Sequence, residues 1–288
     1  MARNFLAVFY SLFFFVLVIL HLLSLLCNMF EAKIQHAVLL KRILDSLKDL
    51  VLQANLDCSP TGIALQALDQ SHVSLVALLL RQEGFESYRC DRSIPLGINI
   101  GSMTKILKCA GNDDSVTIKA DDDGDGDSIT FLFESSHKSS EFELKLMEVE
   151  GDSLAIPDRE YDANVSLPAA EFQRICRDLT VIGETVLIEA SKEGVKFSVK
   201  GEMGNGTILL RPSTEYDAKP EEVTTVDAAK PVSLSFGVKF LNLFTKATAL
   251  SGVVRLSMTE GEPIAIEYPI EELGYVRYYL APKIEEED

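Results

Sequence analysis

Nine basic side chains in four short segments are the residues of this sequence whose type and spacing suggest chemistry. Eight of them form pairs three or seven positions apart, which on a helix point in nearly the same direction. The nine are Lys41, Arg42, Lys48, Lys105, Lys108, Arg174, Arg177, Lys239 and Lys246. The whole chain carries 44 acidic and 27 basic residues and a formal net charge of −17. Basic stripes in an acidic protein favour binding of a polyanion, with an ordinary solvated helix face as the alternative.

An apolar stripe predicts the elements that carry these bases. Leu40, Ile43, Leu44 and Leu47 fall at i, i+3, i+4 and i+7, which is one face of an amphipathic helix. The same stripe begins again at positions 103, 172 and 240, at intervals of 63, 69 and 68 residues. We therefore expect one type of helix used four times, apolar toward a core and basic toward a partner.

Alternating apolar and polar residues predict antiparallel strands around these helices. After the helices we expect strands at residues 62–68, 73–80, 115–120, 128–134, 185–190, 195–200, 253–258 and 264–268. Further strands are expected at residues 88–90, 94–99, 141–147, 207–211, 232–236 and 276–280. A helix with its strands, repeated four times, predicts an α+β protein of two similar domains, each an internal duplication, with the helices on one side of continuous sheets.

The chain has room for two domains that each bury a core. We place them at residues 29–145 and 163–288, joined by a connecting loop at 146–162. Leu154, Ile156 and Pro157 are apolar residues in the middle of this otherwise acidic loop. Either they anchor the loop on the protein or they form a docking surface for a partner.

Residues 1–28 form an apolar N-terminal extension that has two interpretations. As a helix, the run at 5–27 could cross a hydrocarbon layer of ~30 Å. No small-residue cleavage site precedes Met29, and Met29 followed by FEAKIQHAVLL resembles a native start. We expect an upstream extension of the reading frame that is absent from the working protein, with a membrane anchor as the alternative.

The sequence gives no support for a metal site, a disulfide framework or a catalytic site. The five cysteines are scattered and show no paired spacing, and we expect Cys109 and Cys176 to be small core residues of the helix stripes. The run DDDGDGD at 121–127 matches the start of a calcium loop, but the twelfth position is Leu132 instead of Glu, so a solvated hairpin turn is expected. We predict no metal, no cofactor and no enzymatic activity.

Long ordered motifs carry a resemblance to a known family. They are FEAKIQHAVLLKRILDSLKDL, LDQSHVSLVALLLRQEGFESYRCDR, SMTKILKCAGNDD, EFQRICRDL, KEGVKFSVKGEMGNG, FLNLFTKAT and YYLAPKIEEED. Over residues 29–288 the chain resembles the proliferating cell nuclear antigen family, the eukaryotic sliding DNA clamps. The resemblance implies a nuclear, homotrimeric ring with the DNA-clamp fold, whose helices line a hole that holds double-stranded DNA without regard to sequence.

The resemblance also implies roles for individual residues. The nine bases would face DNA, Lys192 would accept ubiquitin or SUMO, and subunits would join through the strands near Phe142 and 203–209. DNA polymerase, clamp loader, flap endonuclease and DNA ligase would dock PIP-box peptides, each with an aliphatic plug and two aromatics. Their groove would use Leu68, His72, Val73, Leu75, Leu154, Ile156, Pro157, Pro263, Tyr279, Ala281, Pro282, Lys283 and Ile284.

Two departures from the family pattern are visible, and one different class of function stays open. Leu68 stands where the family commonly has Met, and Val181 replaces a polar residue after the third helix, which would remove one DNA contact. If the apolar extension is retained, the protein would instead be a membrane-tethered scaffold that recruits proteins through the same groove.

Overall fold

The computed structural model describes residues 29–121, 127–150, 154, 159–213, 219 and 221–283. The apolar extension at 1–28 and residues 122–126 of the calcium-like turn lie outside the described residues. So do Ile156 and Pro157 of the connecting loop and Ile284 of the tail.

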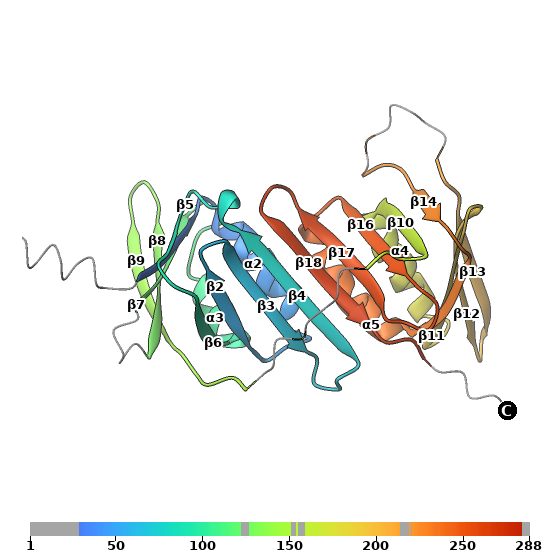
Figure 1. Cartoon of the computed structure of the whole chain (residues 1–288), viewed down its shortest axis with the longest axis horizontal. Coiled ribbons are helices and arrows are strands. Elements are labelled where there is room, and N and C mark those ends of the chain that lie inside the picture. Colours follow the sequence, from blue (N-terminus) through green and yellow to red (C-terminus); the bar gives the residue numbers. More distant parts are fainter. Residues whose placement is uncertain are drawn as a thin grey trace, which may run out of the picture.

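Four copies of one unit, a strand, a helix and three antiparallel strands, make up the described fold (Figure 1). The first unit is β1 (Met29–Ile34), α2 (Ala37–Leu47), β2 (Gln53–Ser59), β3 (Gly62–Leu68) and β4 (Ser74–Arg81). The second is β6 (Ile94–Asn99), α3 (Ile100–Leu107), β7 (Ser115–Asp121), β8 (Ser128–Glu134) and β9 (Ser139–Lys145). The third is β10 (Ala163–Pro168), α4 (Ala169–Thr180), β11 (Thr185–Ser191), β12 (Gly194–Gly201) and β13 (Gly204–Leu210).

The fourth unit is β15 (Val232–Gly237), α5 (Val238–Phe244), β16 (Val253–Met258), β17 (Ile264–Ile270) and β18 (Gly274–Leu280). Its helix continues as a 3₁₀ turn, η2 (Thr245–Ala249). Outside the repeat lie η1 (Gln82–Gly84), β5 (Ser87–Cys90) and β14 (Thr225–Ala228).

The first strand of each unit pairs with the other unit of its domain. β1 pairs with β7 and β6 with β2, while β10 pairs with β16 and β15 with β11. Because of this exchange, neither unit completes its sheet alone, and two units fold as one domain. The seam between the domains is the antiparallel pair β4–β18, which joins the two inner sheets into one order, β14-β10-β16-β17-β18-β4-β3-β2-β6.

All four helices lie on one side of this nine-stranded sheet (Figure 1). The predicted stripe of α2 is buried, with Leu40, Ile43, Leu44 and Leu47 each at most 4% exposed, whereas Ile106 and Leu243 of two other stripes are half-buried. Tyr278 of β18 fastens the helix layer across the domain seam. Its ring stacks on Phe244 at 4.5 Å between centroids, and its hydroxyl donates to the Ser46 carbonyl oxygen of α2 at 3.2 Å. The predicted α+β architecture is confirmed.

Several elements differ from the sequence-based expectation. Strands β1, β2, β10 and β14 were not predicted. β14 has four residues, β10 leads directly into α4, and β1 ends two residues before α2, so that the strand and helix periodicities adjoin there. The fourth helix ends early as a 3₁₀ turn, where Thr245 Oγ1 donates to the Asn242 carbonyl oxygen and competes with the helical bonds. The expectation for Cys109 was wrong: it is exposed beyond the end of α3, whereas Cys176 is buried.

Candidate nucleic-acid and partner interfaces

The nine predicted bases all lie on the four helices, on η2 or directly after a helix, on the helix side of the nine-stranded sheet. We call this set the basic face. Lys41 and Lys48 are half-buried, and the other seven side chains are exposed. The structure therefore brings the predicted set to one side of the molecule, although its members are held in different ways.

Three bases on or next to α2 and on η2 are engaged by the protein itself, whereas Arg42 is exposed. Lys41 Nζ donates to the Ala110 carbonyl oxygen at 2.7 Å and to Asn112 Oδ1 at 3.1 Å, which ties α2 to the end of α3. Lys48 Nζ bonds Asp45 at 2.5 Å, and this hydrogen bond raises the pKa of Lys48. Lys246 forms an ion pair with Asp49 across the domain seam.

On α3, α4 and α5 the bases are freer. Within the described part of the chain, no ion pair involves Lys105 or Lys108. Arg174 Nε and Arg177 Nε share one acid, Asp178, at 3.7 and 3.5 Å. Because both arginines are more than two-thirds exposed, these contacts are weak. This part of the basic face is therefore exposed and only weakly paired.

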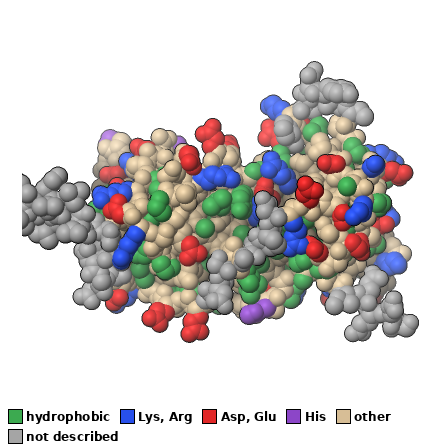
Figure 2. Space-filling model, in the orientation of Figure 1, with side chains coloured by type: hydrophobic (Ala, Val, Ile, Leu, Met, Phe, Trp, Pro, Cys, Tyr) green, Lys and Arg blue, Asp and Glu red, His purple; other side chains and the backbone are tan. Residues whose placement is uncertain are grey.

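The opposite face of the sheet carries a row of groove residues contributed by four strands. Leu68 of β3 lies in register with Leu75 of β4, Leu75 with Tyr279 of β18, and Tyr279 with Ala265 of β17. The row crosses the domain seam, and Leu68 is 41% exposed although it is apolar. Figure 2 shows apolar side chains mingled with charges of both signs on this face.

The loop between β3 and β4, which carries His72 and Val73, is organised by the buried carboxylate of Asp69. Its Oδ1 accepts from the Val73 and Ser74 amides at 2.9 and 2.6 Å, and its Oδ2 from the Ser71 amide at 2.8 Å. Burial alone would raise the pKa of Asp69, but the bonds from Ser71 and Ser74 outweigh it and lower the pKa. They also hold His72 at a φ of 56°, an uncommon conformation for a residue other than glycine.

The connecting loop is fastened at both ends. At its start, Met147 N donates to the Gly97 carbonyl oxygen at 2.9 Å, and Asn55 Nδ2 donates to the Val149 carbonyl oxygen at 3.0 Å. Gly97 is required there, since a Cβ would meet the Met147 carbonyl oxygen at 1.9 Å. At its end, Arg159 pairs with Glu262 in the other domain.

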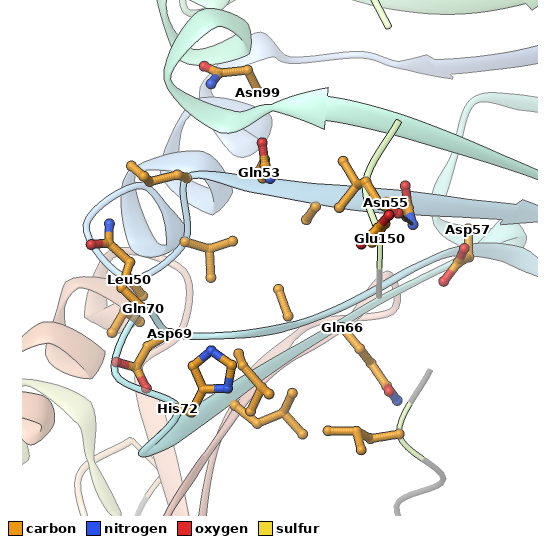
Figure 3. Close-up of a pocket in the computed structure, with 18 residues that line it drawn as sticks. Leu50, Gln53, Asn55, Asp57, Gln66, Asp69, Gln70, His72, Asn99 and Glu150 are labelled. Atoms are coloured by element: carbon orange, nitrogen blue, oxygen red, sulfur yellow. Dashed lines mark hydrogen bonds between the residues drawn. The ribbon is translucent and has the colours of Figure 1, made fainter. Parts of the chain in front are cut away.

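Between this loop and the sheet lies an open cavity of about 730 Å³ (Figure 3). Leu68, His72, Leu75 and Leu154 line it together, so the structure unites these four predicted groove residues. Leu154 is 44% exposed. Leu154 is therefore not held by burial, and its role in a docking surface stays a prediction. We call the predicted set of groove residues the partner groove.

The C-terminal groove residues follow β18. The Ala281 amide donates to the Val73 carbonyl oxygen at 3.2 Å, which brings the tail beside the His72 loop. Lys283 N then donates to the Ser235 carbonyl oxygen at 2.7 Å, so the tail leaves along β15. Pro263 is exposed in the β16–β17 turn, and Pro282 is half-buried.

Two comparisons decide the family. The family model described as the proliferating cell nuclear antigen N-terminal domain matches residues 29–154, and the model of its C-terminal domain matches residues 155–283. A proliferating cell nuclear antigen from Dictyostelium discoideum is 53% identical over 259 residues, covering 89% of this chain and 100% of that protein. This chain belongs to the proliferating cell nuclear antigen family. It is a sliding clamp, a processivity factor of DNA replication and repair.

In this clamp protein, β9 and β13 end the two outer sheets, and among the described residues each pairs on one side only. Met203, beside β13, is 78% exposed, and Leu209 within it is 44% exposed. Phe142 of β9 is half-buried against Phe133, with 5.4 Å between ring centroids. The two predicted joining strands therefore lie at opposite ends of the molecule (Figure 1).

The remaining predictions concern Lys192, metal binding and the membrane. Lys192 is exposed in the tight turn between β11 and β12. Among the residues that the structure describes, no group of His, Cys, Asp and Glu could hold a metal ion. Over that same part of the chain, no helix is both long and apolar enough to span a bilayer. The family match gives no support to the membrane-tethered scaffold.

Sequence reasoning missed the polar residues that support the groove. Asp69 stands before Gln-Ser-His, and an Asp followed two residues later by Ser is typical of a turn closed by the Asp side chain. That signal could have identified it. Arg277 donates to the Tyr279 hydroxyl at 3.1 Å on its own strand, and its acidic partner Glu267 lies on β17, so the alternation along β18 could have paired Arg277 with Tyr279 but not with Glu267.

Proposed function

We propose that this clamp works as a homotrimeric ring that encircles double-stranded DNA and slides on it through the basic face. The observation that carries the proposal is the position of all nine bases on one side of a sheet that continues through both domains. Such a sheet is a stiff segment of rim, and its helices would line the hole. Ring closure would follow from pairing β9 of one subunit with β13 of the next.

Head-to-tail pairing of this kind is heterologous, and it gives a closed ring only at a fixed rotation. Free strand edges are normally paired or covered, which supports a use for β9 and β13. The test is the mass of the protein in solution at micromolar concentration. We expect the mass of three subunits, and the mass of one subunit would contradict the ring.

Retention on DNA would be topological, with the bases providing weak, sequence-independent contacts. Phosphate contacts carry no base information, so movement along the duplex changes little in energy. Bases held by single exposed ion pairs can exchange a carboxylate for a phosphate at small cost. On this view the clamp itself needs no catalytic step.

The partner groove would dock PIP-box peptides of DNA polymerase, clamp loader, flap endonuclease and DNA ligase in the nucleus. Apolar anchors in such grooves often dominate binding, at ~2 kcal/mol or more each. Ile156→Ser should therefore weaken binding of a synthetic PIP-box peptide more than tenfold in calorimetry. Trimer mass and loading onto nicked DNA should stay unchanged, since the connecting loop belongs to neither the basic face nor the subunit edges.

Each other outcome has a clear meaning. Unchanged peptide affinity would overturn the assignment of Ile156 to the groove, and loss of the trimer would show that the loop is structural. We also propose Lys192 as an acceptor of ubiquitin or SUMO, supported by its exposure in a tight turn. Modification mapped elsewhere, with Lys192→Arg fully modified, would contradict that assignment.

A further inference from the structure

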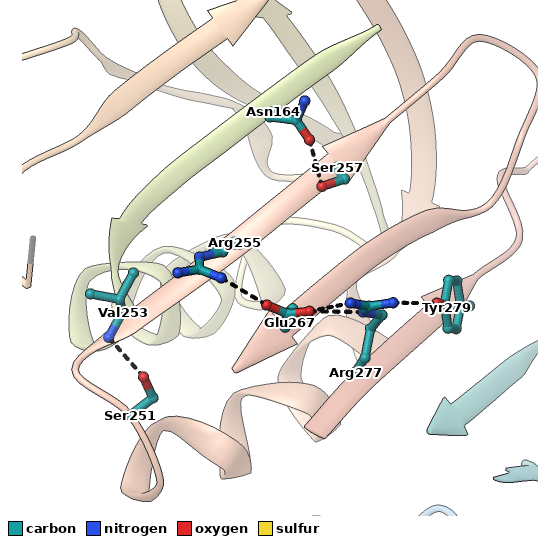
Figure 4. Close-up of polar contacts among 8 residues, drawn as sticks. All are labelled: Asn164, Ser251, Val253, Arg255, Ser257, Glu267, Arg277 and Tyr279. Atoms are coloured by element: carbon teal, nitrogen blue, oxygen red, sulfur yellow. Dashed lines mark hydrogen bonds and ion pairs between the residues drawn. The ribbon is translucent and has the colours of Figure 1, made fainter. Parts of the chain in front are cut away.

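Tyr279 is the predicted groove residue on β18, and a ladder of charged side chains begins beside it on the same face of the sheet (Figure 4). Arg255 of β16, Glu267 of β17 and Arg277 of β18 are cross-strand neighbours in register on the face opposite to the helices. The resemblance to the clamp family gave no role to these three side chains. Their contacts lead to Tyr279, so the ladder is connected to the groove.

Arg277 is the centre of this arrangement. Its Nε donates to Glu267 Oε2 at 2.9 Å, its guanidinium carbon lies 4.4 Å from the centre of the Tyr275 ring, and its Nη1 donates to the Tyr279 hydroxyl at 3.1 Å. Contacts on three sides hold the planar fork in one orientation. Arg255 Nη1 donates to the other Glu267 oxygen at 3.1 Å, and within the described structure Arg255 makes no hydrogen bond to Tyr279.

The chemistry of this contact fixes the direction of the tyrosine hydroxyl bond. An arginine has donors and no acceptor, whereas a tyrosine hydroxyl has one proton and can also accept. The Tyr279 oxygen must therefore accept from Arg277, which leaves its proton free to be donated elsewhere. Among the described residues, no acceptor for this proton is found within hydrogen-bonding distance.

We propose that Arg277 is a positioning residue that presents Tyr279 as a hydrogen-bond donor to the docked peptide. The groove then reads an acceptor, a carbonyl or carboxylate oxygen, beside the apolar anchors that fill it. This inference rests on the proposed peptide-docking function and adds a specificity element to it. Leu75 and Ala265, the register neighbours of Tyr279, are apolar, so the hydroxyl is the polar group of this row.

A double-mutant cycle tests the proposal with a synthetic PIP-box peptide and the whole protein, measured by calorimetry. Tyr279→Phe and Arg277→Met should each weaken binding about three- to tenfold, the size of one hydrogen bond. The double variant should bind the peptide as well as the single variant of lower affinity, because both substitutions remove the same interaction. Arg255→Met is the matched control. It also removes one positively charged partner of Glu267, and it should change peptide affinity less than twofold.

The outcomes separate this inference from the groove itself. If the unmodified protein fails to bind the peptide, the proposed docking function is wrong. If the unmodified protein binds the peptide and Tyr279→Phe does not change the affinity, only the donor role of Tyr279 is overturned. Tyr279→Phe keeps the three charged side chains of the ladder. If the losses of affinity add in the double variant, or if Arg255→Met weakens binding as much as Arg277→Met, the arginines act through their positive charge and not by positioning Tyr279. Trimer mass and unfolding temperature, measured for every variant, confirm that the ring is preserved.

Discussion

On the helix side of the nine-stranded sheet, bases such as Lys105 and Arg177 are exposed and loosely held, whereas on the opposite side the groove is fixed by buried and multiply bonded groups. Asp69 accepts from three backbone amides around His72, and Arg277 is held on three sides beside Tyr279. The two faces of one sheet therefore differ in how much freedom their side chains keep.

This difference matches what each face is proposed to bind. A duplex that must slide presents phosphates at changing positions, and mobile exposed bases follow them at little cost. A short peptide must instead be held in one pose, and a groove ordered beforehand loses less entropy when it binds. The comparison predicts that substitutions which disorder the groove act strongly and locally, while single changes on the basic face act weakly and add together.

The largest effect is expected for Asp69→Ala. The change leaves the amides of Ser71, Val73 and Ser74 without their acceptor. The Ser74 amide is buried, and a buried unsatisfied group costs about 1–3 kcal/mol. The loop should relax, His72 should leave its positive φ, and affinity for a PIP-box peptide should fall more than thirtyfold in calorimetry. Retention on DNA should stay within a factor of two.

Gln70→Ala is the matched control for Asp69→Ala. Gln70 is an exposed neighbour in the same loop and also lines the cavity. It should change peptide affinity less than threefold. Equal losses for the two variants would show that the loop tolerates no change at all, and full affinity in Asp69→Ala would remove the preorganised-groove argument.

A smaller effect, spread over the ring, is expected for Lys105→Ala combined with Arg177→Ala. Each trimer would lose six charges, and each phosphate contact contributes about 0.9 to the slope of log K against log salt. We expect weaker retention on all DNA sequences equally and a shallower salt slope. Sequence-dependent loss would indicate that these residues read bases, and no loss would overturn the DNA-facing role of the basic face.

The same contrast explains what the sequence alone could predict. The helix side is built from local repeats, so the spacing of Leu40, Ile43 and Leu47 was enough to place the bases without any partner in view. The groove is built across strands: Leu68, Leu75 and Tyr279 share a row only because β4 pairs with β18. The resemblance supplied those positions. The contact of Arg277 with Glu267 depends on the β17–β18 register and needed the structure, whereas Asp69 bonds its own loop, a local signal that the sequence carried.

Within the basic face, the adjacent residues Lys41 and Arg42 test whether a base engaged by the protein differs from an exposed one. Lys41 bonds the Ala110 carbonyl oxygen, whereas Arg42 is exposed. We expect Lys41→Ala to lower the free energy of unfolding by about 1–2 kcal/mol, since a charged hydrogen bond to a partly buried carbonyl is lost. Arg42→Ala should leave stability unchanged and weaken DNA retention more than Lys41→Ala does. Equal stability in chemical denaturation would contradict the structural role of Lys41.

The smallest effect is expected where a base is already paired. Lys246 bonds Asp49 across the domain seam, and both side chains are about two-fifths exposed, so the pair contributes little to stability. Asp49→Asn should release Lys246 to the duplex, lengthen retention up to about threefold and steepen the salt slope slightly. Asp113→Asn, at an exposed acid in the α3–β7 loop, controls for the same change of net charge. If Asp49→Asn shortens retention instead, Asp49 aims Lys246 at the phosphates, and the paired part of the basic face would be as ordered as the groove.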